Sequence, residues 1–199
     1  MRYIGICGNI NAGKDEVAKI LEAEYGFTRR AYSDPVYEIL MTLNPLIPIE
    51  PGQFPATSGY RMMRLQDLVQ FYGLDFVKRN SPEVRKYLRL IGTECGRNVF
   101  GQDCWVDRMG EDSLYDDKTV ITGIRFMNEV EFVRENGGVI WWIRSNREIP
   151  ADPSHISETL DYSSVADYWL DNNHDIPVLR NTVIHKYRQT LQDRENGIV

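Results

Sequence analysis

Short apolar runs recur along the chain, and segments in which apolar residues repeat at helical spacing separate them. The run 3–7 stops at a glycine, and Val17, Ile20 and Leu21 then predict a helix over 13–25. Further strands are expected at 27–32, 119–124, 139–143 and 168–170, and further helices at 34–43, 128–136 and 177–194. Strands that alternate with helices in this way predict an α/β fold with a parallel sheet and right-handed crossovers.

The middle of the chain breaks this alternation. Residues 44–59 contain four prolines and two glycines without any periodicity, which is typical of a surface loop or insertion. From 61 to 110 the pattern is helical, and Ser81, Pro82 and Glu83 are typical of a helix start. We therefore expect one domain over 1–199 with a helical insertion at 44–110. The polar stretch 144–164 contains two prolines and is expected to be a mobile loop.

The composition is typical of a globular protein that does not bind nucleic acid over an extended surface. Hydrophobic residues make up 42% and charged residues 26% of 199 residues, which is enough for a core. A net charge of −6 argues against extended binding to nucleic acid, which needs an excess of Lys and Arg. No apolar run approaches the roughly 20 residues of a membrane span, and the start does not resemble a signal peptide. Three scattered cysteines favour neither disulfides nor zinc. We expect a cytoplasmic protein that binds no membrane.

A phosphate-binding motif follows the first predicted strand. Residues 8–15 read GNINAGKD and match G-x-x-x-x-G-K, with Asp15 where Ser or Thr is usual. The glycines permit a tight turn that points N–H groups at an anion, and the following helix adds its positive end. Lys14 can reach the β and γ phosphates of a bound nucleotide. The residues predicted to bind the nucleotide are Gly8, Asn11, Ala12, Gly13, Lys14, Asp15 and Glu16.

The carboxylate of Asp15 has two interpretations. A carboxylate is a hard oxygen ligand that can hold Mg²⁺ directly or through water, in place of the usual hydroxyl. An acidic residue in the first turn of a helix is also favoured by the helix dipole alone. Both interpretations can hold together, and we predict that Asp15 is a metal ligand.

Three later stretches resemble the signatures of one family. Residues 90–97 and 100–106 read LIGTECGR and FGQDCWV, residues 124–129 read IRFMNE, and His155, Ser157 and Glu158 form an H-x-S-E motif. Together with the G-K-D form of the phosphate loop, this ordered set resembles the phage-type deoxynucleoside monophosphate kinases of the P-loop nucleoside monophosphate kinase superfamily. The resemblance runs from residue 2 to about residue 173.

The resemblance implies a fold, cofactors and a substrate. The fold is a P-loop NTPase three-layer α/β fold with a central parallel sheet, in which 44–110 binds the acceptor and 144–164 forms a lid. ATP and Mg²⁺ are the implied cofactors, a deoxynucleoside monophosphate is the implied acceptor, and a homodimer is suggested. For a phage-encoded enzyme the location would be the host cytoplasm.

One position departs from the family pattern. The family usually has an Asp two residues before the Arg of its R-F element, and this chain has Gly123 there. If that Asp helps to hold the metal or the acceptor, then Asp15 or Asp34 must take over its role, or the acceptor differs.

Arginines are the main candidates for contacts with the acceptor, because phosphoryl transfer needs positive charge and their planar forks pair with phosphate oxygens. Arg97 and Arg125 lie inside matched motifs and, with Lys14, are predicted to be catalytic. Arg144 and Arg147 open the expected lid and are predicted to contact the nucleotide. The predicted acceptor ligands are Asp34, Arg64, Arg85, Arg97, Trp105, Arg125 and Glu129.

Several of these residues can have a purely structural role, and two functions other than a deoxynucleoside monophosphate kinase stay open. Asp34 can be only a helix N-cap, Trp105 only a core aromatic, and Glu129 a support for Arg125. A P-loop kinase for another small phosphorylated acceptor, such as phosphomevalonate, is one alternative, because some of these kinases also use G-K-D. A non-catalytic nucleotide-binding protein is the other, and Gly123 is the feature that favours it.

Overall fold

The computed structural model describes residues 1–55, 59–147 and 160–198. The chain divides into two compact units, the first made of Met1–Tyr32 and Val106–Val199, and the second of Ser33–Trp105.

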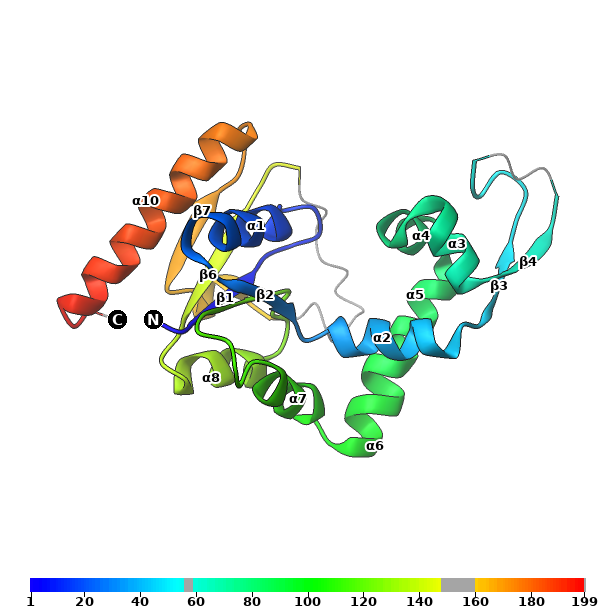
Figure 1. Ribbon diagram of the computed structural model, residues 1–199, viewed down its shortest axis with the longest axis horizontal. Coiled ribbons are helices and arrows are strands. Elements are labelled where there is room, and N and C mark those ends of the chain that lie inside the picture. Colours follow the sequence, from blue (N-terminus) through cyan, green and yellow to red (C-terminus); the bar gives the residue numbers. More distant parts are fainter. Residues whose placement is uncertain (56–58, 148–159, 199) are drawn as a thin grey trace. The chain divides into compact units, whose positions relative to one another are not determined.

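The first unit is built on a five-stranded sheet (Figure 1). Its strands are β1 (Tyr3–Cys7), β2 (Thr28–Ala31), β5 (Thr119–Thr122), β6 (Val139–Arg144) and β7 (Tyr168–Asp171). They lie in the order β2-β5-β1-β6-β7, and every neighbouring pair is parallel. The carboxyl ends of all five strands therefore lie along one edge, where open α/β sheets bind ligands. The expected α/β P-loop fold is confirmed.

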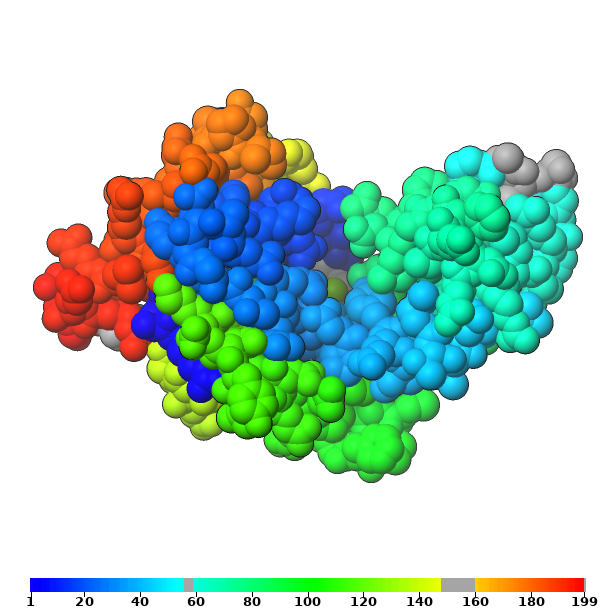
Figure 2. All heavy atoms as spheres, in the orientation of Figure 1, coloured from blue at the N-terminus to red at the C-terminus, as the bar shows by residue number. Residues whose placement is uncertain are grey.

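Helices cover both faces of this sheet (Figure 1). Those of the first unit are α1 (Lys14–Tyr25), α7 (Cys104–Asp112, which begins in the second unit), α8 (Met127–Glu135), α9 (Tyr162–Val165) and α10 (Ile176–Glu195). α1 and α10 share one apolar core with the sheet, to which Leu21, Trp141 and Val183 contribute. The atoms of α1, in blue, and of α10, in orange and red, lie side by side in Figure 2. α8 packs on β1 and β6 from the opposite face.

Helix ends in this unit follow local sequence rules. α1 ends at Gly26, whose φ of 68° and N–H bond to the Glu22 carbonyl form a left-handed C-cap. α10 begins after Asp175, whose carboxylate accepts the N–H of Val178 at 3.1 Å.

In the described part of the chain, no helix has the length and apolar character needed to cross a membrane.

The second unit has an apolar core of its own. Its elements are α2 (Asp34–Leu43), β3 (Leu46–Ile49), β4 (Arg61–Arg64), α3 (Leu65–Tyr72), α4 (Leu74–Asn80), α5 (Pro82–Arg89), the π-helix η1 (Leu90–Arg97) and α6 (Asn98–Phe100). Ile47, Leu68 and Val84 belong to one cluster that joins β3, α3 and α5. The Ser81 hydroxyl accepts the N–H of Val84 at 3.3 Å and caps α5, as its position before Pro82 predicts.

The interpretation of 44–59 as a loop without regular structure is wrong in part. β3 lies within this stretch and pairs antiparallel with β4, which occupies the start of the stretch expected to be helical. Ile47 and Ile49 are fully buried whereas Leu46 is exposed, so the strand has the period of two that marks one buried face. Pro48 conceals this pattern, but both strands of a two-stranded ribbon are edge strands, where proline is tolerated.

Two smaller expectations also need correction. Ser33, and not Asp34, precedes the helix, and Asp34 is its first residue. At the end of the expected loop 144–164, the helix α9 (Tyr162–Val165) begins at residue 162, while 148–159 lie outside the described residues.

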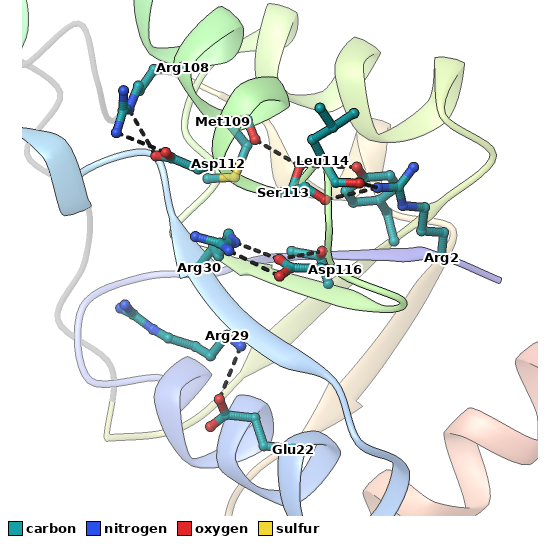
Figure 3. Close-up of polar contacts among 12 residues, drawn as sticks. Arg2, Glu22, Arg29, Arg30, Arg108, Met109, Asp112, Ser113, Leu114 and Asp116 are labelled. Carbon is teal, nitrogen blue, oxygen red and sulfur yellow. Dashed lines mark hydrogen bonds and ion pairs between the residues drawn. The ribbon is translucent and has the colours of Figure 1, made fainter.

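An ion pair fixes the edge strand β2 to the segment that precedes β5 (Figure 3). Arg30 Nε donates to Asp116 Oδ2 at 2.5 Å and Arg30 Nη2 donates to Oδ1 at 3.0 Å, so the pair is bidentate. The Asp116 side chain is only 11% exposed. The hydrogen bonds and charge of Arg30 lower the pKa of the Asp116 carboxyl below its usual value.

Asp116→Asn is expected to lower the free energy of unfolding at pH 7 by about 1–3 kcal/mol, because it removes hydrogen bonds between charged groups. The pKa of Asp116 is lower in the folded chain than in the unfolded one. The contribution is therefore complete above about pH 4 and is lost as the pH falls through the folded value. Urea unfolding measures the free energy of unfolding of both proteins. The difference between wild type and variant should be smaller at about pH 3 than at pH 7. The control Asp117→Asn changes the same charge on an exposed neighbour and should cost less than about 0.5 kcal/mol.

Candidate active site

The loop between β1 and α1 has the backbone of a phosphate-binding turn. The φ angles of Gly8, Asn11 and Gly13 are 141°, 65° and 92°, a region that favours glycine and asparagine. Space is limited as well, since a Cβ on Gly8 would lie 2.5 Å from the carbonyl oxygen of Ile143. A Cβ on Gly13 would lie 2.1 Å from Asn172 Nδ2. Conformation and packing therefore both require glycine at the two motif positions.

Lys14 is the first residue of α1 and folds back over this loop. Its Nζ donates to the carbonyl oxygens of Gly8 at 2.8 Å and of Asn9 at 2.7 Å. These bonds hold the ammonium group against the turn whose N–H groups would surround an anion. A cation in this place can form charge-assisted hydrogen bonds with phosphate oxygens.

Cys7 precedes the loop but is not a nucleophile. The residue is fully buried at the end of β1. Burial raises the pKa of its thiol to about 12, although the nearby charge of Lys14 acts in the opposite direction. The thiol is therefore neutral near pH 7, and a neutral thiol is unreactive.

A pocket opens at the edge of the sheet where β1 and β5 end. Its lining residues are Gly8, Asn9, Ile10, Lys14, Gly123, Arg125 and Tyr162. Two of the three residues predicted to be catalytic, Lys14 and Arg125, thus line one pocket. Two cationic side chains beside a nest of N–H groups make this pocket suited to an anion with several phosphate groups.

The backbone around Arg125 is fixed by a buried carboxylate. Glu129, only 3% exposed, accepts the N–H of Arg125 at 2.8 Å and the N–H of Phe126 at 3.2 Å through Oε2. The carboxylate thereby caps the start of α8, and Tyr32 donates its hydroxyl to the Glu129 carbonyl at 3.1 Å. These bonds support the open alternative, in which Glu129 supports Arg125, and contact of Glu129 with the acceptor stays a prediction.

Gly123 joins the end of β5 to this pocket. Its φ is 76°, and its N–H and that of Ile124 both donate to the Ile6 carbonyl. Among the residues that the structure describes, a Cβ on Gly123 would meet no atom within 4 Å. Within these residues, position 123 therefore has room for a side chain that the glycine does not supply.

Asp15 lies in the first turn of α1 with its side chain 70% exposed, and Arg29 Nη2 lies 3.6 Å from its Oδ1. Among the described residues, no cluster of three His, Cys, Asp or Glu side chains forms a metal cage. A single exposed carboxylate next to a phosphate loop nevertheless fits Mg²⁺, which in nucleotide sites takes one or two carboxylates and completes its shell with phosphates and water. Arg29 competes for the same carboxylate. Glu16, its neighbour, pairs with Lys19 at 2.6 Å.

The two arginines at the end of β6 have different surroundings. Arg144 pairs with Asp171 at 2.8 Å, and its guanidinium lies 5.5 Å from the ring of Trp142 and 5.6 Å from that of Trp169. In this position Arg144 links β6 to β7 and does not line the pocket. Arg147 instead donates through Nη2 to the carbonyl oxygen of Asn172 at 2.9 Å.

Comparison with known proteins decides the family. The profile of the family described as deoxynucleotide monophosphate kinase matches residues 40–183, more than half of the chain. The chain belongs to this family. The deoxynucleoside-5'-monophosphate kinase of Escherichia phage T5 is 25% identical over 178 residues, which cover 66% of this chain and 71% of that protein. A protein of Acanthamoeba polyphaga mimivirus, to which the same kind of activity is attributed, is 24% identical over 99% of this chain and 98% of its own.

Among solved structures, a dephospho-CoA kinase from Campylobacter jejuni covers the whole of both chains at 14% identity and a TM-score of 0.44. A shikimate kinase from Acinetobacter baumannii covers 97% of this chain and 94% of its own at 12% identity and a TM-score of 0.47. The family membership makes the protein a nucleotide kinase that transfers a phosphoryl group to deoxynucleoside monophosphates.

In the second unit of the kinase, several predicted acceptor ligands have structural partners. Arg97 is 4% exposed and donates through Nη1 to the Gln102 carbonyl at 2.5 Å. Trp105 donates its Nε1–H to the Gly92 carbonyl at 2.7 Å, and its ring occupies the place of a Cβ on Gly96. The alternative that Trp105 is a packing residue therefore has direct support.

The other predicted acceptor ligands of this unit are more exposed. Arg85 Nη1 donates to the carbonyl oxygen of Arg79 at 2.7 Å, at the end of α4. Arg64 Nη1 donates to the Asn44 carbonyl at 3.0 Å. Asp34 is half-buried at the start of α2. These contacts leave the acceptor roles of the three residues untested.

Two residues of the site escape the sequence motifs. Tyr162 lines the pocket, and Asn172 contacts the phosphate loop, although both follow the loop by about 150 residues or more in the sequence. The one sequence signal that could have found Asn172 is a polar residue directly after a strand, because such residues lie at the edge of the sheet where ligands bind. The H-x-S-E motif of His155, Ser157 and Glu158 lies outside the described residues.

Proposed function

We propose that the kinase transfers the γ-phosphoryl group of ATP to a deoxynucleoside 5'-monophosphate and releases the diphosphate and ADP. The observation that carries this proposal is the pocket that Lys14 and Arg125 line together beside the phosphate loop. Family membership supplies the acceptor class, and the glycine-rich turn supplies the place for the triphosphate.

The residues of the pocket have separate roles in the proposed reaction. An oxygen of the acceptor phosphate attacks the γ-phosphorus, and the bridging oxygen leaves with ADP. Lys14 stabilises the negative charge on the β and γ phosphates, and Arg125 holds the acceptor phosphate in line with the γ-phosphorus. No general base is required, because a monophosphate oxygen is already ionised near neutral pH.

Asp15 is proposed as the protein ligand of Mg²⁺, which neutralises charge on the phosphate oxygens when it is bound. Asp15→Ala is expected to raise the Mg²⁺ concentration at half-maximal rate by about tenfold, since it removes one hard oxygen ligand. Asp15→Thr should restore most of the wild-type value, because Thr is the usual P-loop residue. A Mg²⁺ titration of the rate at saturating nucleotide measures the shift, with Glu24→Gln, an exposed carboxylate near the other end of the same helix, as the control. An unchanged midpoint in Asp15→Ala would exclude the metal role.

The acceptor is proposed to contact the helical segment 44–110. Arg85 and Arg64 remain candidate ligands for its phosphate, and Arg97 remains a candidate catalytic residue through family resemblance. The structural contacts of Trp105 and Arg144 make direct substrate roles for these two residues less favoured than support of the fold. Activity as a homodimer in the cytoplasm, or in a host cytoplasm, remains a prediction.

The test is an ADP-release assay with ATP and Mg²⁺ against the four common deoxynucleoside monophosphates, their ribonucleotide forms and hydroxymethylated pyrimidine forms. Turnover with one or more deoxynucleotides is expected, and the pattern identifies the preferred base. Binding of ATP without turnover of any acceptor would overturn the proposal and would make Gly123 the mark of a lost activity.

A further inference from the structure

Asn172 occupies the junction between the sheet edge and the phosphate loop. It follows directly after β7, is 5% exposed, and donates its N–H to the Arg144 carbonyl at 2.8 Å. Its Nδ2 donates to the Ala12 carbonyl at 2.9 Å, across 160 residues of sequence. Since Ala12 belongs to the phosphate loop, this bond connects the last strand of the sheet to the loop itself.

The bond to Ala12 orients a donor of the loop. The Ala12 carbonyl and the Gly13 N–H belong to one planar trans peptide, in which these two groups point in opposite directions. A hydrogen bond that fixes the carbonyl toward Asn172 therefore fixes the Gly13 N–H away from Asn172. Accepting a bond at the carbonyl also polarises the peptide, which makes its N–H a better donor to an anion.

The close packing of Asn172 explains the second motif glycine. A Cβ on Gly13 would lie 2.1 Å from Asn172 Nδ2, well inside any normal contact. The amide group of Asn172 occupies the space that a side chain at position 13 would need. The loop conformation and the Asn172 side chain are therefore fitted to each other.

Arg147 and Ser145 hold Asn172 from the other side. The Asn172 carbonyl accepts bonds from Ser145 Oγ at 2.9 Å and from Arg147 Nη2 at 2.9 Å. Arg147 Nη2 also lies 3.3 Å from Asn172 Oδ1. Because a guanidinium can only donate, this contact fixes which end of the amide carries oxygen and turns the NH₂ group toward Ala12.

We propose that Asn172 is a positioning residue for nucleotide binding, which holds the Gly13 N–H in the orientation that a phosphate requires and is itself oriented by Arg147. This inference rests on the proposed function for the identity of the ligand. It gives Arg147 a role through Asn172, in place of the direct contact with the nucleotide that its sequence position predicts. A buried asparagine that only stabilises the fold would affect all properties of the kinase alike, whereas a positioning residue affects nucleotide binding selectively.

The decisive variant is Asn172→Asp, which keeps the shape and the contact with Arg147 but replaces the donor to Ala12 by an acceptor. We expect the Kd for a non-hydrolysable ATP analogue and the KM for ATP to rise by about 10- to 100-fold, since misplaced binding groups have effects of this size. The KM for the deoxynucleoside monophosphate should stay within about threefold of the wild-type value. Asn173→Asp is the matched control, because Asn173 is the exposed neighbour whose Oδ1 accepts the N–H of Asn146. It should bind the analogue within about twofold of wild type.

A second variant tests the link to Arg147. Arg147→Ala should weaken analogue binding by about three- to tenfold, and should have little further effect in the Asn172→Asp background, because residues that act through one contact are not additive. If the effects of Arg147→Ala and Asn172→Asp on analogue binding were fully additive, the proposed role of Arg147 would be overturned.

If Asn172→Asp does not fold, Asn172→Ser, which has a smaller side chain, replaces it in the same binding measurement. Unchanged analogue binding in a folded variant at position 172 would overturn the role of Asn172. Wild type that binds the analogue but turns over no acceptor would instead contradict the proposed function alone, because the binding measurement needs no acceptor.

Discussion

Lys14→Ala is expected to lower kcat by about 10²–10³-fold, the loss that follows removal of one preorganised donor from a charged transition state. The Lys14 ammonium lines the pocket and is held within 2.8 Å of two carbonyl oxygens of the loop. Negative charge spreads over the equatorial oxygens during phosphoryl transfer, so a fixed cation at this place acts mainly on the transition state. The KM for ATP should rise less than kcat falls. Steady-state kinetics on the purified variant measure both effects.

The fold of this variant should remain intact, because Lys14 is half-buried at the surface of the loop and contributes no side chain to the apolar core. The control is Lys19→Ala, which removes an exposed lysine of the same helix that pairs with Glu16. This control should keep kcat within about twofold, as distant surface changes do. Near-full activity in Lys14→Ala would refute the assignment of the pocket as the active site.

Gly8→Ala is expected to abolish measurable nucleotide binding and to destabilise the kinase. The φ of 141° at Gly8 is unfavourable for any L side chain. The new Cβ would also lie 2.5 Å from the Ile143 carbonyl oxygen, which is backbone of a central strand and cannot move aside. The two effects together are expected to cost about 2–5 kcal/mol of unfolding free energy. Thermal unfolding with and without ATP measures both consequences.

Gly26→Ala separates conformational strain from the clash. Gly26 also has a positive φ, 68°, but a Cβ there would meet no atom of the described residues within 4 Å. The substitution should cost only about 1 kcal/mol of strain and should leave the stabilisation by ATP unchanged. Equal losses in the two variants would show that the contact with Ile143 does not constrain the loop.

Most of the helices and strands that the sequence predicts correctly depend only on residues that are close to one another in the sequence. The strand 3–7, the helix over 13–25 and the P-loop between them follow from local periodicity and from glycines that permit positive φ. The expected strands at 119–124, 139–143 and 168–170 appear as β5, β6 and β7. The hairpin of β3 and β4 was missed because its pairing joins segments on either side of a proline-rich stretch, and pairing between distant segments leaves no local periodicity.

The motif at residues 124–129 combines a residue that lines the pocket with one that fixes the backbone beside it. The R-F-x-N-E element places Arg125 in the pocket, but Glu129 turns inward and binds backbone N–H groups. The sequence does not distinguish an acid that contacts the substrate from one that caps its own helix, since both place an acidic residue in the first turn.

The α/β class, the phosphate loop with Lys14 and the family could all be predicted from the sequence, because each depends on residue types at fixed local spacing. Which distant residues meet that loop could not be predicted in this way and follows from the tertiary fold. Arg125 follows β5, Tyr162 begins α9, and Asn172 follows β7. They reach the loop because parallel strands bring their carboxyl ends to one edge of the sheet, and the order of the strands in the sheet is not encoded in any local pattern.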